Sequence, residues 1–400
     1  MKPRPPLLRC KNVSASPLSR QRSSFNNTIR TPLAFQPGSQ CQRRNISSPA
    51  ALDPNPTVIL PDLFVSFLSQ KPTPNPNYKK LRGLLEPSMR NIFNYSNREY
   101  KKRVRADFPY FGALFAPTAA SLEYQTICDY FHWIFDFDDM FDDGRLSKDP
   151  EGARRELDRL VAILSSDTAV TKADGLRYVF QTIWKRIVQS STKGVQERFA
   201  KYTRDYCDAI ARQITEGQQQ QQLNNTSVED YIKIRSESLG ARPFFPLIEY
   251  SQFLDLPDEI FNHPAIKEIE AVAVEILVLH NDLLSYQKEY STSPTSPNII
   301  TLYRHHHRHP NAQHQNLPPL TQQQAYNSID ELLRARYKRW YMAHANLPVL
   351  GEKVDEQVQK YVGGCADVVR SNLYWSFWTE RYFGEEKEEV RRTRRVRALG

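Results

Sequence analysis

The sequence predicts an all-α protein, and three observations lead to that prediction. Apolar residues recur at helical spacing through long segments between about residues 59 and 383. Few segments alternate apolar and polar residues as strands do, and no Gly-rich turn follows a strand pattern. The composition, with 40% hydrophobic and 25% charged residues, is typical of a globular chain that can bury a sizeable core without disulfides.

The expected helices follow one another from the first ordered residues near Ile59. Phe64, Phe67 and Leu68 stand at i, i+3 and i+4, which begins the helical pattern. A long apolar segment after Pro117 predicts one buried helix. The main helices are expected at Ala119–Asp139, Glu151–Leu164, Val195–Glu216, Val228–Ser238, Ile266–Tyr290, Gln322–Ala345 and Glu352–Phe383.

Composition divides the chain into three parts. Residues 1–52 hold nine Lys or Arg, no Asp or Glu and no apolar periodicity, which predicts a disordered basic tail. Residues 53–384 form the expected helical domain, and the charge run at 385–400 is expected to be a tail. Subtracting nine from the net charge of +9 leaves residues 53–400 about neutral, so nucleic acid is not an expected partner.

The same tail bears on location. An Arg- and Ser-rich segment without acids also fits an organelle import signal, and a plain solvated tail is the alternative. We expect a cytoplasmic protein without a stable membrane anchor, because no apolar run reaches the roughly 20 residues of a spanning helix. The five cysteines have no metal-ligand spacing, and the glutamine run 218–222 and the His-rich segment 304–319 are expected to be solvent loops.

An acidic cluster marks the end of the first long helix. Five carboxylates fall within eight residues: Asp136, Asp138, Asp139, Asp142 and Asp143. Carboxylates at the negative end of a helix repel one another, and a divalent cation would neutralise them. Asp138 and Asp142 are four residues apart and share a face, whereas Asp139 points about 100° away and is expected to meet an Arg or a water. Oxygen ligands suit Mg²⁺, although an acidic helix end that opens into a loop is the other interpretation.

A second polar set ends a later apolar helix. Asn281, Ser285 and Glu289 stand at i, i+4 and i+8, so an amide, a hydroxyl and a carboxylate oxygen line up on one face as ligands for a hard cation. Lys288 beside them is a natural phosphate contact. A helix that emerges into solvent would explain the polarity, but not this choice of residues at this spacing.

Two further segments add cations. Arg381 and Tyr382 offer a guanidinium fork and a hydroxyl for phosphate oxygens, and Arg235 precedes a Gly at a helix break. Each is weak alone, but together with Lys288 and the two metal-binding helix ends they would hold a diphosphate leaving group. The carbocation left behind requires a dry aromatic cavity, for which Phe131, Phe135 and Trp375 are the candidates. Ordinary core packing is the alternative for each of these aromatic residues.

These motifs resemble those of the class I terpene synthases of fungi and bacteria, most closely the fungal sesquiterpene synthases. The family patterns D-D-x-x-D/E, N-D-x-x-S-x-x-K-E and W-S-x-x-S/T-x-R-Y stand in the family's order at Asp138–Asp142, Asn281–Glu289 and Trp375–Tyr382. The resemblance spans about residues 58–383. It implies a single α-domain bundle of the class I terpenoid synthase fold. It also implies Mg²⁺-dependent ionisation of farnesyl diphosphate with loss of diphosphate, then cyclisation to a sesquiterpene hydrocarbon or alcohol.

The resemblance also implies a role for each matched residue. Asp138, with Asp142, would hold two of three Mg²⁺ ions, and Asn281, Ser285 and Glu289 would hold the third. Arg235 stands 46 residues before Asn281, at the place of the family's diphosphate-sensing arginine. Ser238 and Leu239 would then follow as the linker and effector of a helix break, unless Gly240 is the residue at the break. The diphosphate would be bound by Arg235, Lys288, Arg381 and Tyr382, and the catalytic residues would be Asp138, Arg235 and Arg381.

Three alternatives are weighed against this interpretation. An isoprenyl diphosphate synthase would repeat an Asp-rich motif where this chain has Asn281, Ser285 and Glu289. A non-catalytic helical binding protein is not favoured, because all three motifs are intact, and a nucleic-acid binder would depend on the basic tail. The identity of the product stays open, as does the choice between a monomer and a homodimer. Geranyl or geranylgeranyl diphosphate also remains an alternative substrate.

Overall fold

The computed structural model describes residues 56–399 except 143, 167–168, 216–225, 293, 295–296 and 306–318. The expectations for the N-terminal tail, the glutamine run and most of the His-rich segment lie outside the described residues. Asp53–Gly400 form one compact unit. The all-α expectation is confirmed: within the described ranges, the strands are two three-residue segments.

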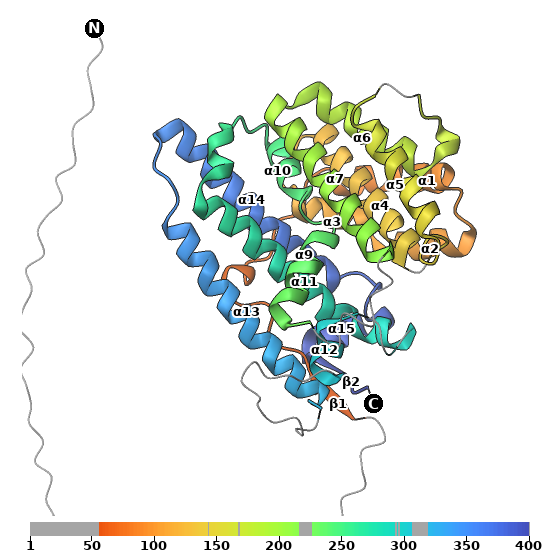
Figure 1. The fold of residues 1–400 in the computed structure, drawn as a ribbon, viewed down its shortest axis with the longest axis vertical. Coiled ribbons are helices and arrows are strands. Elements are labelled where there is room, and N and C mark those ends of the chain that lie inside the picture. The colour runs from red at the N-terminus through yellow and green to blue at the C-terminus, as the bar shows by residue number, and fades with distance from the viewer. Residues whose placement is uncertain are drawn as a thin grey trace, which may run out of the picture. The chain divides into compact units, whose positions relative to one another are not determined.

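Helices make up most of the described chain (Figure 1). Its first half contains α1 (Tyr78–Phe93), α2 (Asn97–Ala106), α3 (Phe108–Phe115), α4 (Ser121–Asp142), α5 (Pro150–Ile163), α6 (Leu176–Ser190) and α7 (Lys193–Thr215). The second half contains α9 (Val228–Ser238), α10 (Phe244–Gln252), α11 (Pro264–Thr292), α12 (Ile299–His305), α13 (Gln322–Ala345), α14 (Glu352–Ser376) and α15 (Lys387–Thr393). Short 3₁₀ turns occur at Ser66–Leu68, Lys172–Asp174, Asp258–Asn262 and Gly384–Glu386.

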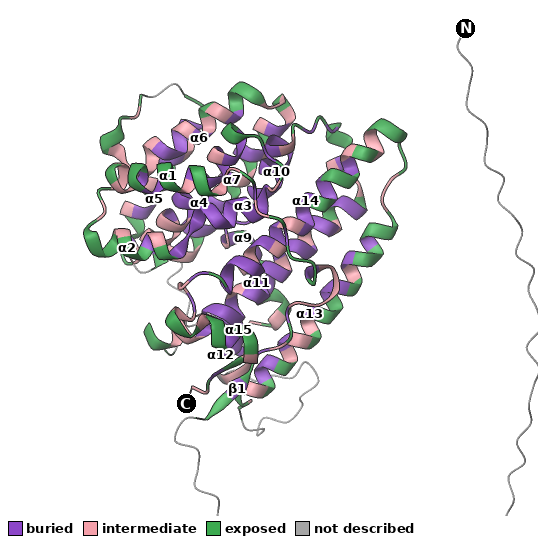
Figure 2. Ribbon diagram, turned by 180° about the vertical axis from the view of Figure 1, so that it is seen from behind, coloured by how far each residue is buried: buried purple, intermediate pink, exposed green. Residues whose placement is uncertain are grey.

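The core lies where α3, α4, α11 and α14 meet. The helix α11 packs against α13 and α14, and α3 packs against both α4 and α14. Buried residues gather on these helices in Figure 2, while the outer faces of α5 and α13 are exposed. Helix α11 is central because its apolar residues surround it: Val272, Ala273, Val274 and Ile276 are all fully buried.

Several helix ends follow local signals. The predicted segments Val228–Ser238 and Gln322–Ala345 coincide with α9 and α13, each begun by a hydroxyl cap, Ser227 and Thr321. Helix α14 ends at Ser376, short of the expected Phe383, because the chain tightens into a turn. In this turn the amides of Trp378 and Thr379 both bond to the carbonyl of Trp375, at 2.9 and 2.8 Å.

The C-terminal residues differ from the expected charged tail. Residues 387–397 form α15 and β2 (Arg395–Arg397), and β2 pairs antiparallel with β1 (Thr57–Ile59). Val390 and Val396 supply the apolar contacts, since both are buried. The carbonyl of Arg397 also accepts a hydrogen bond from Gln287 Nε2, which ties this strand to α11.

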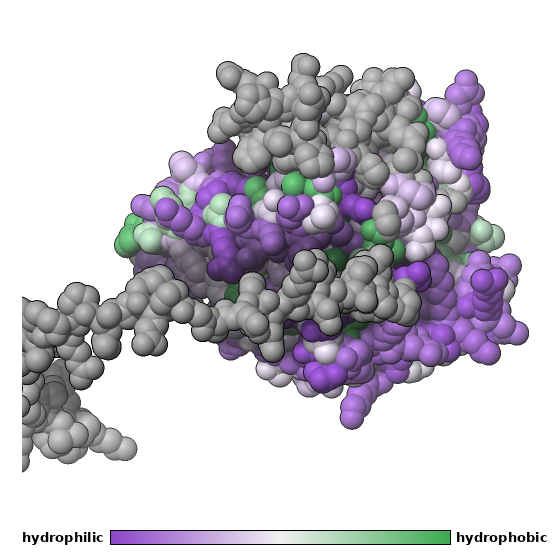
Figure 3. All heavy atoms as spheres, turned by 90° about the horizontal axis from the view of Figure 1, so that it is seen from below, coloured by the Kyte–Doolittle hydropathy of each residue, from purple (hydrophilic) through white to green (hydrophobic). Residues whose placement is uncertain are grey.

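No described helix is long and apolar enough to cross a bilayer. The face seen in Figure 3 is mostly hydrophilic, with hydrophobic residues in small separate groups.

Candidate active site

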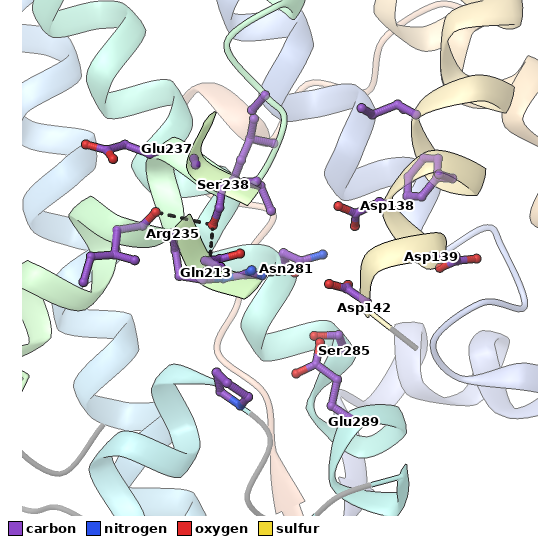
Figure 4. Close-up of a pocket in the computed structure, with 18 of the residues that line it drawn as sticks. Asp138, Asp139, Asp142, Gln213, Arg235, Glu237, Ser238, Asn281, Ser285 and Glu289 are labelled. Carbon is purple, nitrogen blue, oxygen red and sulfur yellow. Dashed lines mark hydrogen bonds between the residues drawn. The ribbon is translucent and has the colours of Figure 1, made fainter. Parts of the chain in front are cut away.

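The last turns of α4 point two carboxyls into a cavity of about 380 Å³. Figure 4 shows Asp138 and Asp142 directed from α4 toward the end of α11. The hydroxyl of Tyr206 on α7 donates to Asp138 Oδ1 at 3.0 Å, which orients that carboxyl. Burial, and after it the charge of Asp138, raises the pKa of Asp142 well above its ordinary value. A cation between these carboxyls would offset their repulsion.

Asp139 turns away from these two residues, as its helical position predicts (Figure 4). It accepts hydrogen bonds from Arg103 Nη2 and Arg381 Nη2, each at 3.0 Å. Burial alone would raise the pKa of Asp139, but the two guanidinium groups hold it at about 2. The expectation that Asp139 meets an Arg is confirmed, and Asp139 joins the first motif to the third.

Arg103 and Tyr95 complete this wall and were missed by sequence reasoning. Arg103 on α2 also forms an ion pair with Asp136, and the hydroxyl of Tyr95 donates to the same carboxyl. Helix α2 is a strongly polar segment, so its sequence gave no sign that one of its arginines is buried. Only the tertiary fold brings α2 to the end of α4.

The end of α11 lines the opposite side of the cavity with Asn281, Ser285 and Glu289. Ser285 is buried, and its Oγ has no hydrogen-bond partner among the described residues. Asn298 Nδ2 donates to Glu289 Oε2 at 3.0 Å and fixes that carboxylate. A buried hydroxyl without a partner is costly, so the aligned amide, hydroxyl and carboxylate oxygens fit a bound cation.

The residues present fit a metal only in combination with a ligand. Among the described residues, no group of three His, Cys, Asp or Glu side chains is arranged to hold a metal ion alone. Two carboxyls on α4 instead face mixed oxygen ligands on α11 across the cavity. Mg²⁺ usually binds in this way, through one or two carboxylates, waters and substrate phosphates.

Asp282, the neighbour of Asn281, does not line the cavity but is buried behind it. It is 1% exposed, and its Oδ2 accepts hydrogen bonds from the hydroxyl of Tyr231 at 2.6 Å and the amide of Ile299 at 2.8 Å. Arg235 Nη2 lies 3.7 Å from its Oδ1. Burial raises the pKa of Asp282 to about 6. This carboxyl therefore ties α9, α11 and the start of α12 together behind the cavity.

The expected diphosphate contacts surround the same space. Arg235, Lys288, Arg381 and Tyr382 all line the cavity. Arg235 Nη2 lies 3.4 Å from Asn281 Oδ1, so the arginine on α9 contacts the second motif directly. The guanidinium of Arg381 stands 5.0 Å from the ring centroid of Phe135. Four donors from three segments therefore converge on one region.

The helix break after Arg235 falls at the edge of the cavity. Helix α9 ends at Ser238, and both Ser238 and Leu239 line the cavity. Ser238 Oγ accepts a hydrogen bond from Gln213 Nε2 at 2.9 Å (Figure 4). Gly240 takes φ +71° and lies against Tyr206, where an added Cβ would be 3.1 Å from the ring. The chain thus reverses at Gly240, while the two preceding residues face the cavity.

The aromatic part of the cavity differs from the prediction at two positions. Phe135 lines it as expected, together with Phe111 on α3 and Phe244 on α10. Phe131 and Trp375 do not line it, because they stack on Phe111 from behind, with ring centroids 4.0 and 4.7 Å away. The indole nitrogen of Trp375 donates to the carbonyl of Ala106 at 2.7 Å, which fixes it in this outer layer.

Comparison with known proteins agrees with this geometry. Residues 129–339 match the family described as "Terpene synthase family 2, C-terminal metal binding". The silphinene synthase of Penicillium patulum is 38% identical over 86% of this chain and 90% of its own length. The (+)-eremophilene synthase of Gibberella fujikuroi is 32% identical over 82% of this chain and 89% of its own length.

Solved structures share the fold. Germacradien-4-ol synthase from Streptomyces citricolor superposes with a TM-score of 0.64 at 18% identity, over 78% of this chain and 98% of that one. Wild-type cucumene synthase gives a TM-score of 0.63 at 18% identity, over 76% of this chain and 97% of that one. At these identities the likeness establishes the architecture alone.

Proposed function

This chain belongs to the terpene synthase family, and we propose that it is a sesquiterpene synthase that cyclises farnesyl diphosphate. The proposal is supported above all by Asp138 and Asp142 facing Asn281, Ser285 and Glu289 across a cavity with an aromatic end. The relatives include a silphinene synthase, a (+)-eremophilene synthase and a protein named sesquiterpene synthase 1, and the matched family is described as metal binding.

We propose that three Mg²⁺ ions bind with the substrate. Asp138, with Asp142, would hold two ions, and Asn281, Ser285 and Glu289 would hold the third. Metal held by these residues would supply positive charge against the negative charge that develops on the diphosphate. Tyr206 and Asn298 keep Asp138 and Glu289 in the required orientation through their hydrogen bonds.

The cationic side chains bind and orient the diphosphate. Arg235 and Lys288 approach from α9 and α11, and Arg381 and Tyr382 approach from the segment after α14. The electron pair of the C–O bond leaves with the diphosphate, so these donors stabilise the ionised state more than the intact substrate. Because Arg381 is held by Asp139, its guanidinium is already in place before substrate arrives.

The aromatic end of the cavity receives the carbocation. Phe111, Phe135 and Phe244 present rings that stabilise a positive charge and exclude water. Cyclisation ends when the cation loses a proton, which gives a hydrocarbon, or when it captures a water molecule that then loses a proton, which gives an alcohol. Phe131 and Trp375 support these rings from behind rather than touching the substrate.

Separate incubations with geranyl, farnesyl and geranylgeranyl diphosphate in Mg²⁺ test the substrate. We expect cyclic products from farnesyl diphosphate at the highest kcat/KM, identified by gas chromatography and mass spectrometry. Turnover of geranyl or geranylgeranyl diphosphate without turnover of farnesyl diphosphate would contradict the proposed substrate. The predictions of a cytoplasmic location and of a monomer or homodimer are tested by a fluorescent fusion and by light scattering.

A further inference from the structure

A second cleft, which we call the outer cleft, opens beside the central cavity. It has a volume of about 850 Å³ and lies between α2 and the segment after α14. Its cationic residues are Arg98, Lys101, Lys102, Arg103, Arg105 and Arg381, and its acidic residues are Glu99, Glu380 and Glu385. The mechanism proposed above gives this cleft no role.

Four of these cations form a stripe along α2. Arg98, Lys101, Lys102 and Arg105 stand at i, i+3, i+4 and i+7, so they share one helix face, and all four are exposed. Like charges at this spacing destabilise a helix. Arg98, Lys101 and Lys102 form no ion pair within the described ranges. A multivalent anion would offset the repulsion along this stripe.

The acids of the outer cleft are mostly engaged elsewhere. Glu99 Oε2 accepts a hydrogen bond from the amide of Ser96 at 2.9 Å, in the capping box of α2. Glu380 pairs with Arg105 at 3.5 Å and with Lys387 at 3.9 Å. Glu385 is the remaining carboxylate at the rim, so the α2 side of the cleft keeps a positive field.

Two guanidinium groups separate the outer cleft from the central cavity. Arg381 lines both spaces, and Arg103 lines the outer cleft. Arg103 is 9% exposed, and its Nη1 has no hydrogen-bond partner in the described chain, while its Nη2 binds Asp139 at 3.0 Å. A buried guanidinium nitrogen without an acceptor is costly, and a phosphate oxygen would satisfy it.

We propose that the outer cleft is a second anion site that binds inorganic diphosphate. This inference rests on the proposed function, because the reaction there releases that anion on the other side of Arg103 and Arg381. The cationic stripe and the unpartnered guanidinium nitrogen fit a compact anion with two phosphoryl groups, for which arginine forks are suited. Occupation of the outer cleft would hold the product next to the active site and slow its escape.

Calorimetric titration with sodium diphosphate in EDTA tests this site without turnover. The Glu289→Gln protein serves as the background, so that metal-dependent binding in the central cavity is removed. We expect this variant to bind diphosphate in the outer cleft without metal, and to bind orthophosphate more weakly. The added changes Arg98→Gln, Lys101→Gln and Lys102→Gln should weaken binding about tenfold or more.

A matched control removes three exposed cations elsewhere, through Lys79→Gln, Lys80→Gln and Lys267→Gln in the same background. This control should bind diphosphate as the Glu289→Gln protein does, with thermal melting used to show that all variants are folded. Equal weakening in both triple variants, or no binding in the background protein, would overturn the outer site. Terpene formation by the wild type would stand in either case, so the two proposals fail separately.

Discussion

Asp282 and Asn281 are adjacent in the second motif, and the structure predicts that alanine at Asp282 lowers stability whereas alanine at Asn281 removes activity. Asp282→Ala leaves the Tyr231 hydroxyl and the Ile299 amide without their acceptor, both in buried surroundings. Each stranded donor costs about 1–3 kcal/mol, and the charge of Arg235 loses its buried partner as well. We therefore expect Asp282→Ala to lower the free energy of unfolding by about 3 kcal/mol or more.

Asn281→Ala is the matched comparison. The contact described for the Asn281 side chain is a long one, 3.4 Å from Arg235 Nη2, so its loss should change the unfolding free energy by less than about 1 kcal/mol. Turnover should nevertheless disappear, because this amide oxygen is a proposed metal ligand. Urea unfolding in EDTA measures the first effect, and product formation in Mg²⁺ measures the second. An Asp282→Ala protein as stable as the wild type would refute this reading of the motif.

Three further predictions follow from single residues. Glu289→Gln should abolish turnover and leave the far-ultraviolet circular dichroism unchanged; full activity in this variant would remove Glu289 from the metal site. Phe244→Ala should widen the aromatic end of the cavity and change the ratio of cyclic products at unchanged Mg²⁺ dependence, and an unaltered product profile by gas chromatography would exclude contact with the substrate. Burial and the charge of Asp107 raise the pKa of Glu86 from 4.5 to about 7, so its ionisation makes the fold less stable as pH rises from about 4.5 through 7. The free energy of unfolding of Glu86→Gln, measured with urea, should therefore exceed that of the wild type by about 1–3 kcal/mol at pH 8 and equal it near pH 4.5. An equal difference at both pH values would contradict the raised pKa of Glu86.

Local spacing explains which parts of the site were predictable. The shared face of Asn281, Ser285 and Glu289, and the divergence of Asp139 from Asp138, depend only on the geometry of one helix. For the same reason α9 and α13 were predicted with their observed bounds. These inferences needed no knowledge of which helices pack together.

Tertiary contacts explain the rest. Arg103 is buried only because α2 reaches the end of α4, and its polar surroundings in the sequence resemble those of any exposed helix. Phe111 faces the cavity while Phe131 lies behind it, because α3 lies against α4. Strand β2 likewise forms only because it pairs with β1, more than 300 residues away in the sequence. The charge run at the C-terminus gives no indication of this pairing.

The central claim is that two oxygen-lined helix ends hold metal around a diphosphate and so start cyclisation. Incubation of the purified protein with farnesyl diphosphate, first in Mg²⁺ and then in EDTA, followed by gas chromatography of the organic extract, tests it most directly. We expect a sesquiterpene that appears in Mg²⁺, vanishes in EDTA and returns when Mg²⁺ is added in excess. The same product formed in EDTA, or no product from any isoprenyl diphosphate in Mg²⁺, would contradict it.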